Sequence, residues 1–215
     1  MRKFSIISIL IFMATFALLT VSYSKSWAHI NFLAEYSDGS TKWIPYIEWY
    51  PLNAKDILND VTVKFSDDSE TWSVMGFKLN SFIQISNASL SFAILAWVVS
   101  LVMIILSIAD TLEVKLPPIG KFLGFAVFLF SLLSFLIYLG APAAKRKDCD
   151  AQRPDCDNLN FAPNKFFGTF TTSTNNDSYE FKYGPSSGWN CIVIACSVSL
   201  VGSIFNIFFF NHQNV

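Results

Sequence analysis

The side chains that most readily do chemistry are scarce in this sequence. It has two histidines, His29 and His212, which lie near opposite ends of the chain. A phosphate-binding glycine-rich loop and an HExxH metal motif are both absent from it. The sequence therefore predicts no catalytic residue, no cofactor, no small-molecule substrate and no enzymatic activity.

Two cysteines, Cys149 and Cys156, are close enough in sequence to act together. A disulfide between them would close a short ring, worth about 2.5 kcal/mol by the chain-entropy relation. Metal binding is the alternative, because four aspartates surround the two sulfurs: Asp148, Asp150, Asp155 and Asp157. The spacing is not that of a zinc site, and no histidine is near enough to complete a tetrahedron. We expect a structural disulfide and no bound metal.

The composition indicates a membrane protein. Hydrophobic residues make up 53% of the 215 residues and charged residues only 14%, against about 25% charged in soluble domains. Four stretches of the sequence, of 21, 31, 23 and 33 residues, contain no charged residue. Each is long enough to cross a bilayer as a helix, which needs roughly 20 apolar residues. With a net charge of −1 and no basic run longer than Lys145-Arg146-Lys147, nucleic acid is not an expected partner.

These uncharged stretches predict an all-α membrane bundle of four transmembrane helices, at residues 4–24, 85–109, 122–144 and 189–211. The first segment has a competing interpretation as a cleaved signal peptide, since small residues precede a possible cut at Lys25. Its apolar stretch of about 18 residues is longer than the usual signal-peptide core of 7–15. We therefore expect the first segment to be retained.

The basic residues Arg2 and Lys3 favour a cytoplasmic N-terminus, at residues 1–3. A cytoplasmic loop at 110–121 and a cytoplasmic tail at 212–215 follow, with extracellular loops at 25–84 and 145–188. The run Lys145-Arg146-Lys147 opposes this orientation, but long loops translocate largely regardless of charge. Asn176, in Asn176-Asp177-Ser178, is a glycosylation acceptor in the second extracellular loop.

The first extracellular loop predicts a small antiparallel β-sheet. Residues 27–36 and 42–49 flank an Asp-Gly turn, which is typical of a hairpin. Residues 61–65 and 72–78 are two further β-rich runs, and 54–59 is expected to form a short helix. Three tryptophans of this loop are candidates for contacts with other proteins if they are exposed: Trp43, Trp49 and Trp72. The alternative is that they form the core of the sheet.

Small residues in the predicted helices indicate where helices pack. Ala195, Ser199 and Ser203 recur every four residues, and Gly120 and Gly124 form a GxxxG motif. We expect these stripes to face the inside of the bundle while phenylalanine and leucine face lipid. Their use for binding another membrane protein is the alternative.

The arrangement resembles the claudin and peripheral-myelin-protein-like tetraspan superfamily. The most specific local similarity is the segment entering the fourth helix, Tyr183-Gly184-Pro185-Ser186-Ser187-Gly188-Trp189. The first loop lacks the Gly-Leu-Trp and cysteine-pair signature of claudins, so their tight-junction function and disulfide are not carried over. The resemblance implies the architecture and a broad role in adhering or organising at a membrane.

The sequence thus predicts a non-enzymatic, multi-pass protein of the plasma membrane or endomembranes. Its expected partners are the lipid bilayer and other membrane proteins or further copies of itself, in an adhesion, scaffolding or membrane-organising role. The alternative is an auxiliary subunit that regulates a channel or transporter through lateral helix contacts at Ala195, Ser199 and Ser203.

Overall fold

The computed structural model describes residues 2–35, 41–56, 61–64, 79–112, 114, 120–152, 165–174 and 177–209. The chain divides into two compact units. The helical unit comprises Met1–Ser24, Ser89–Leu136 and Asn190–Val215, and the sheet unit comprises Lys25–Ala88 and Ile137–Trp189.

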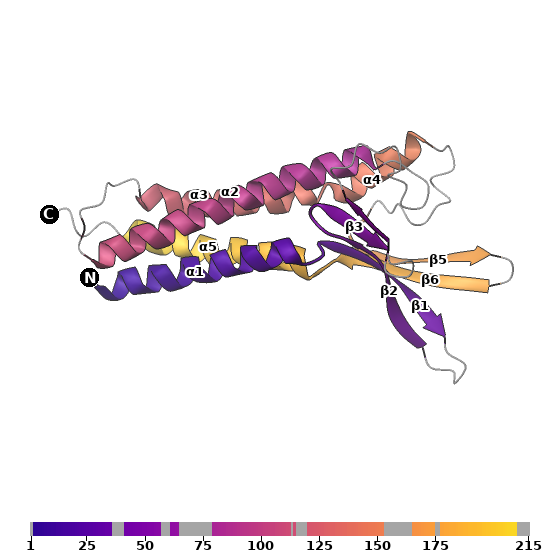
Figure 1. Cartoon of the computed structure of the whole chain (residues 1–215), viewed down its shortest axis with the longest axis horizontal. Coiled ribbons are helices and arrows are strands. Elements are labelled where there is room, and N and C mark those ends of the chain that lie inside the picture. Colours follow the sequence, from indigo (N-terminus) through magenta and orange to yellow (C-terminus); the bar gives the residue numbers. More distant parts are fainter. Residues whose placement is uncertain are drawn as a thin grey trace. The chain divides into compact units, whose positions relative to one another are not determined.

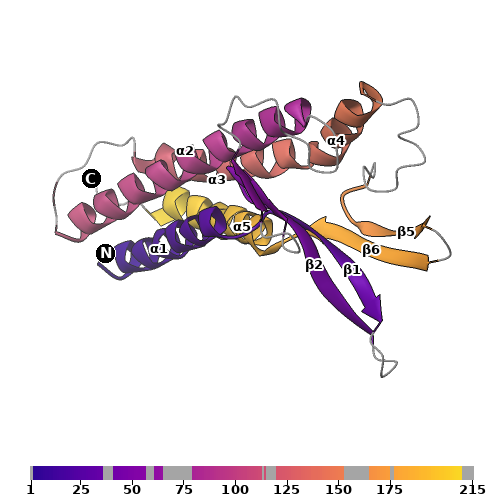
Figure 2. The ribbon, with the colours of Figure 1, turned by 45° about the vertical axis from the view of Figure 1, so that its right-hand side comes forward.

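Four long helices supply the helical unit: α1 (Arg2–Ser24), α2 (Asn80–Thr111), α3 (Gly120–Tyr138) and α5 (Ser187–Phe209). They run side by side (Figures 1 and 2). Four helical stretches of the described chain are long and apolar enough to cross a membrane: Ser5–Ser24, Asn80–Thr111, Phe122–Asp150 and Ser187–Phe208. The prediction of four transmembrane helices is confirmed, and the protein is a four-span integral membrane protein.

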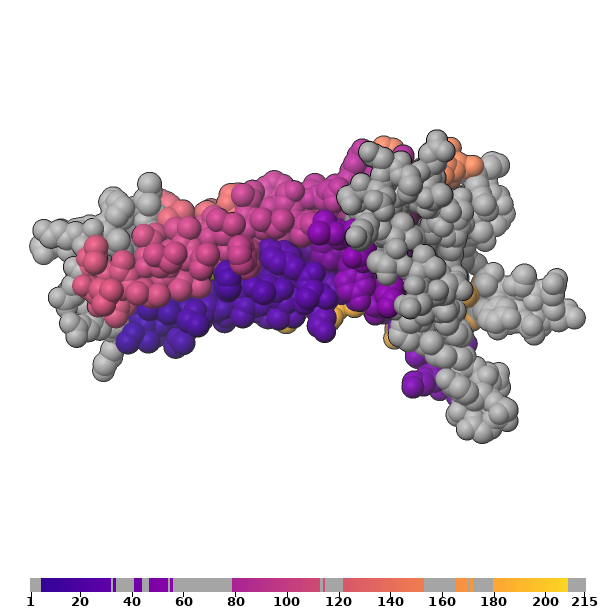
Figure 3. Space-filling model, in the orientation of Figure 1, coloured from indigo at the N-terminus to yellow at the C-terminus, as the bar shows by residue number. Residues whose placement is uncertain are grey.

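Large apolar side chains lie on the outside of the helical unit. Leu10, Phe122 and Phe208 are 61%, 74% and 68% exposed, whereas the fully or almost fully buried positions include many small residues, among them Ala93, Ala96, Ser100, Ser131, Ser134 and Ala195. The side chains of α1 and α2 meet along the visible face without an open groove (Figure 3). This distribution suits helices dissolved in hydrocarbon, because lipid chains are as apolar as leucine and small residues let helix backbones approach closely.

The third apolar stretch is not one continuous helix. It breaks after Tyr138 and resumes as α4 (Ala141–Asp150), with Pro142 in the first turn of α4. Proline has no N–H to donate to the preceding turn, and its ring clashes with the carbonyl four residues earlier. Pro142 therefore accounts for the break. Beyond it, helical structure resumes and runs to Asp150, six residues past the end that the sequence predicts.

The sheet unit contains a six-stranded antiparallel sheet of order β4-β3-β2-β1-β6-β5. Its strands are β1 (Ala28–Glu35), β2 (Thr41–Trp49), β3 (Asn53–Asp56), β4 (Val61–Lys64), β5 (Gly168–Thr174) and β6 (Asp177–Pro185). The predicted sheet of the first connecting segment is confirmed, because β1 to β4 all come from it. The second connecting segment adds β5 and β6, which the sequence analysis did not predict.

The predicted helix at 54–59 is wrong where the structure describes it. Residues 53–56 form β3, which follows β2 through a tight turn closed by the Tyr50 N–H donating to the Asn53 carbonyl at 2.7 Å. Glu48 then faces Lys55 across the strands, and opposite charges at such positions stabilise a sheet. The run 72–78, predicted as a fourth strand, lies outside the described residues.

Pro45 occupies the part of β2 that is paired on one side only. The β1–β2 register shifts between Ile30 and Asn31, and β2 pairs with β3 only over Ile47–Trp49. A proline, which cannot donate to the ladder, is tolerated at such an edge or bulge. The shift keeps Ile30 opposite Ile47, and both are buried.

The residues that follow α1 are hydrogen-bonded to those that precede α5. The Trp27 carbonyl accepts from the Ser186 N–H at 2.9 Å, and the Ser26 carbonyl accepts from the Gly188 N–H at 2.8 Å. A Cβ on Gly188 would lie 2.6 Å from the Lys25 carbonyl oxygen and 2.8 Å from that of Ser26. Only glycine permits this close approach of two backbones.

We predict that Gly188→Ala destabilises the protein, although alanine favours helices more than glycine does. Backbone must shift to admit the new methyl group, and overpacking of this kind costs about 1–3 kcal/mol. Gly184→Ala is the matched control, since its Cβ would meet only the Phe167 Cβ at 3.5 Å, an ordinary contact. Thermal unfolding in detergent measures both, and equal midpoints for the two variants would contradict the prediction.

Candidate functional site

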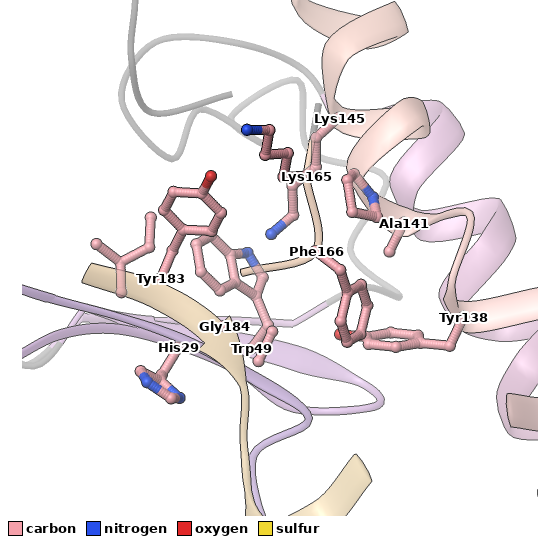
Figure 4. Close-up of a pocket in the computed structure, with 12 residues that line it drawn as sticks. His29, Trp49, Tyr138, Ala141, Lys145, Lys165, Phe166, Tyr183 and Gly184 are labelled. Carbon is pink, nitrogen blue, oxygen red and sulfur yellow. The ribbon is translucent and has the colours of Figure 1, made fainter. Parts of the chain in front are cut away.

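A small cavity in the sheet unit gathers aromatic and basic side chains (Figure 4). It is lined by residues of β1, β2, β6 and α4, by Tyr138 at the end of α3, and by Lys165 and Phe166 just before β5. Its volume is about 30 Å³, enough for one or two water molecules. Such a space fits a small group and not a whole drug-sized molecule.

Lys145 of α4 points its side chain toward this cavity. Its ammonium lies 3.5 Å from the centroid of the Trp49 ring and 4.6 Å from that of Phe82. A cation over an aromatic face gains about 0.5–2 kcal/mol, with the larger value where water is excluded. Among the described residues no carboxylate forms an ion pair with Lys145.

Trp49 presents an unused hydrogen-bond donor. The residue is only 2% exposed, and its ring packs edge-on against Phe82 with centroids 6.3 Å apart. Its indole Nε1 is buried and has no hydrogen-bond partner in the part of the chain that the structure describes. Figure 4 shows this nitrogen beside the Lys145 ammonium. A buried donor without an acceptor is rare in native proteins and calls for an explanation.

Tyr138 and Phe166 line another side of the cavity, and two further rings, Trp27 and Trp189, pack against them. Trp27 and Tyr138 pack edge to face at 5.1 Å, Tyr138 and Phe166 do so at 6.0 Å, and Phe166 lies 4.9 Å from Trp189. Each such pair is worth about 0.5–1.5 kcal/mol beyond its buried area. These rings come from four separate parts of the chain, so the cluster exists only when the sheet unit is assembled.

Asp148 fixes α4, and with it Lys145, to the start of α2. Its carboxylate accepts hydrogen bonds from the backbone N–H groups of Ser81 at 2.8 Å and Phe82 at 2.9 Å, and the residue is 6% exposed. These N–H groups have no partner inside the helix, and a negative charge is favourable at a helix N-terminus. Asp148 therefore acts as an N-cap supplied from 66 residues away.

His29 does not take part in the cavity chemistry. It alternates with Ala28 and Ile30 along β1, and its ring lies on the opposite side of the strands from Lys145 (Figure 4). Burial lowers the pKa of His29; Glu48 opposes this shift, and Lys182 adds to it. The imidazole is therefore neutral at pH 7.

The three predicted interaction tryptophans lie in different environments. Trp49 is buried, so it belongs to the core, the alternative stated for it above, and it offers no surface for a partner. Trp43 of β2 is half-buried, with the Lys182 ammonium 6.0 Å from its ring. Trp72 lies outside the described residues.

Two other predicted features fall partly or wholly outside those residues. Cys149 is buried in α4 and has no free thiol, in contrast to Cys191 and Cys196. Cys156 is not described, so the Cys149–Cys156 bridge stays a prediction, as does glycosylation at Asn176. Asp150 pairs with Arg146 at 3.0 Å, and the described residues contain no group of three or more potential metal ligands.

The small-residue stripes lie inside the helical unit. Ala195, Ser199 and Ser203 are at most 1% exposed. A Cβ on Gly124 would meet the Asn206 Nδ2 at 3.1 Å, and the Ser203 hydroxyl donates to the Gly124 carbonyl at 2.7 Å. Gly120 is the first residue of α3.

Several polar side chains of the helical unit bond to one another or to the backbone. The Ser8 hydroxyl donates to the Asn206 Oδ1 at 2.8 Å, and the Ser89 hydroxyl donates to the Ser134 carbonyl at 2.8 Å. Ser5 donates to Asp110, which pairs α1 with the end of α2. Sequence analysis did not find these pairs, because residues 45 to 198 positions apart in sequence carry no spacing signal.

We predict that Asp148→Ala lowers the free energy of unfolding by about 2 kcal/mol, because two buried N–H groups lose their acceptor. Asp150→Ala is the control on the same helix. Its ion pair with Arg146 is half-exposed and worth about 0–1 kcal/mol. Thermal or denaturant unfolding in detergent compares the two, and an equal effect would rule out the capping role.

We predict that stability falls as the pH drops below about 6.5. The pKa of His29 is lower in the fold than its ordinary value, so between the two values only the unfolded chain is protonated, and acid favours unfolding with a slope of up to about 1.4 kcal/mol per pH unit. His29→Gln removes this contribution. Unfolding midpoints between about pH 7.5 and pH 5.5 measure it, and an unchanged slope in the variant would contradict the assignment.

The tetraspan-like topology rests on the chain itself: four long apolar helices and an antiparallel sheet whose first four strands lie between the first and second of them. In comparisons with known proteins, no family model matches the chain and no curated protein matches it.

Proposed function

We propose that this four-span membrane protein is a non-enzymatic adhesion, scaffolding or membrane-organising component that acts through its sheet unit. The observation that carries this proposal is the construction of the sheet. Both long connecting segments contribute strands to it, β1 to β4 from one and β5 and β6 from the other. A chain that needs only linkers between membrane helices has no use for a six-stranded sheet.

The sheet opens into two arms that suit contact with another protein. β1 pairs with β6 only over Ala28–Phe32 and Phe181–Pro185, and the β1–β2 and β5–β6 hairpins diverge beyond these residues (Figures 1 and 2). Residues 33–35 and 177–180 are therefore paired on one side only within the described sheet. Such edges accept a strand from another chain.

Trp43 is the side chain best placed for this contact. It lies opposite Leu33 in the β1–β2 arm, beyond the region where β1 and β6 pair, and it is half-buried. Tryptophan is enriched among the residues that dominate binding energy at interfaces. We propose that Trp43 anchors the contact and that a second copy of this protein is the first partner to test.

The proposed orientation has both termini in the cytoplasm and the sheet unit on the extracellular or lumenal side. The basic N-terminus, the glycosylation acceptor at Asn176 and the cysteine pair support it, since an oxidising compartment permits a disulfide. The resemblance to claudin and peripheral-myelin-protein-like proteins is in keeping with the same orientation and the same broad role.

The alternative, an auxiliary subunit of a channel or transporter, has less support. Its proposed contact surface is Ala195, Ser199 and Ser203, and these side chains are buried within the helical unit. A lateral partner would instead have to bind the exposed apolar faces of the helices, which lipid also covers.

We predict that two differently tagged copies are recovered together from cells, and that Trp43→Ala reduces this recovery severalfold, as loss of an anchor worth about 1–2 kcal/mol implies. Thr171→Ala, an exposed position on β5, is the control and should behave as the wild type. Recovery of one channel in equal amounts, without self-association, would contradict the proposal and favour the auxiliary subunit.

Tags beside Asp38 and Asp177 must also be accessible in intact, non-permeabilised cells if the protein reaches the plasma membrane in the proposed orientation.

A further inference from the structure

The cavity of the sheet unit brings together hydrogen-bond donors without acceptors. The Lys145 ammonium lies 3.5 Å from the Trp49 ring centroid and has no ion pair among the described residues, and the Trp49 Nε1 is buried without a partner. Leaving such groups unpaired away from water costs free energy, more for a charge than for a neutral donor. An acceptor from outside the described chain would relieve both costs at once.

The remaining polar side chains around the cavity are also donors. Lys165 supplies a second ammonium, farther from Trp49 than that of Lys145 (Figure 4). Tyr183 supplies a hydroxyl, which is protonated at neutral pH and can donate. The described residues that line the cavity include no aspartate or glutamate. Its other titratable residues are Tyr138, whose ring packs against Phe166, and His29, whose ring lies on the opposite side of the strands.

We propose that this cavity binds a phosphate group, either as inorganic phosphate or as the phosphate of a lipid headgroup. Two ammonium groups match the charge of a phosphate, and its several oxygens can accept from Lys145, Trp49 and Tyr183 together. The volume of about 30 Å³ admits one small oxyanion. Trp49, Tyr138 and Phe166 line the cavity, and such low-dielectric surroundings strengthen a charge-assisted hydrogen bond.

Apolar surroundings alone do not explain Lys145. Its aliphatic stem could pack on Trp49 and leave the ammonium in water, as lysines commonly do; the exposed Lys147, two residues along the same helix, is an example of a solvated lysine. Asp148 instead locks α4 to the start of α2 through two hydrogen bonds, which holds Lys145 above the rings. This geometry holds the Lys145 ammonium where an anion in the cavity would contact it.

Binding is tested on the purified full-length protein in detergent. One arm adds sodium phosphate, compared with sodium chloride at equal ionic strength, and the other adds phosphatidic acid, compared with diacylglycerol of the same chains. A ligand that binds only the folded state raises the unfolding midpoint. A rise in the first arm identifies free phosphate, and a rise confined to the second identifies a lipid headgroup.

Lys145→Met keeps most of the length of the unbranched side chain and removes the charge, and it should weaken phosphate binding by about tenfold or more. Trp49→Phe keeps an aromatic, though smaller, ring and removes the N–H, and it should weaken binding by about threefold to tenfold. Lys147→Met, exposed on the same helix, should bind as the wild type does. The proposal is overturned if neither arm shifts the wild-type midpoint, or if Lys145→Met and Trp49→Phe respond like the wild type. Phosphate binding does not depend on self-association, so the phosphate proposal can fail while the proposed function stands.

Discussion

The absence of water around the spanning helices is the constraint on which the rest of this structure depends. In hydrocarbon, apolar side chains gain nothing by hiding from the solvent, while every polar group must find its partner within the protein. In the helical unit, Phe122 and Phe208 accordingly face outward, and Ser203 lies inside and donates to the Gly124 carbonyl. The Ser131 Oγ and the Asn206 Nδ2 are exceptions, buried without a hydrogen-bond partner among the described residues. Small residues at these positions let the backbones come close enough for such bonds.

The same constraint explains what the sequence could predict. An uncharged gap of 20 or more residues has only one physical meaning when charges are frequent elsewhere, so the four spans could be found from composition alone. The β1–β2 hairpin could be found because its turn residues and alternation are local. The break after Tyr138 was also encoded locally, in Pro142, but an apolar stretch that continues to Ala144 hid it.

Pairings between distant segments could not be predicted. Residues 53–56 have a helix-compatible sequence, and they become strand because Lys55 faces Glu48 and β4 pairs along their other side. β5 is rich in threonine and β6 alternates aromatic and charged residues, but their place beside β1 is set by a register across some 150 positions. The candidate site is of the same kind, since Trp49, Phe82 and Lys145 come from three separate segments and meet only in the folded sheet unit.

The pairing of β1 with β6 also orders events during synthesis. The chain between the end of β1 at Glu35 and the start of β6 at Asp177 includes two of the four spans. At about 5–20 residues per second, roughly seven to thirty seconds separate the emergence of the two strands from the ribosome. Throughout that interval β6 is not available to pair with β1. The nascent protein therefore exposes unpaired backbone N–H and C=O groups along one edge of β1 until its last helix is about to enter the membrane.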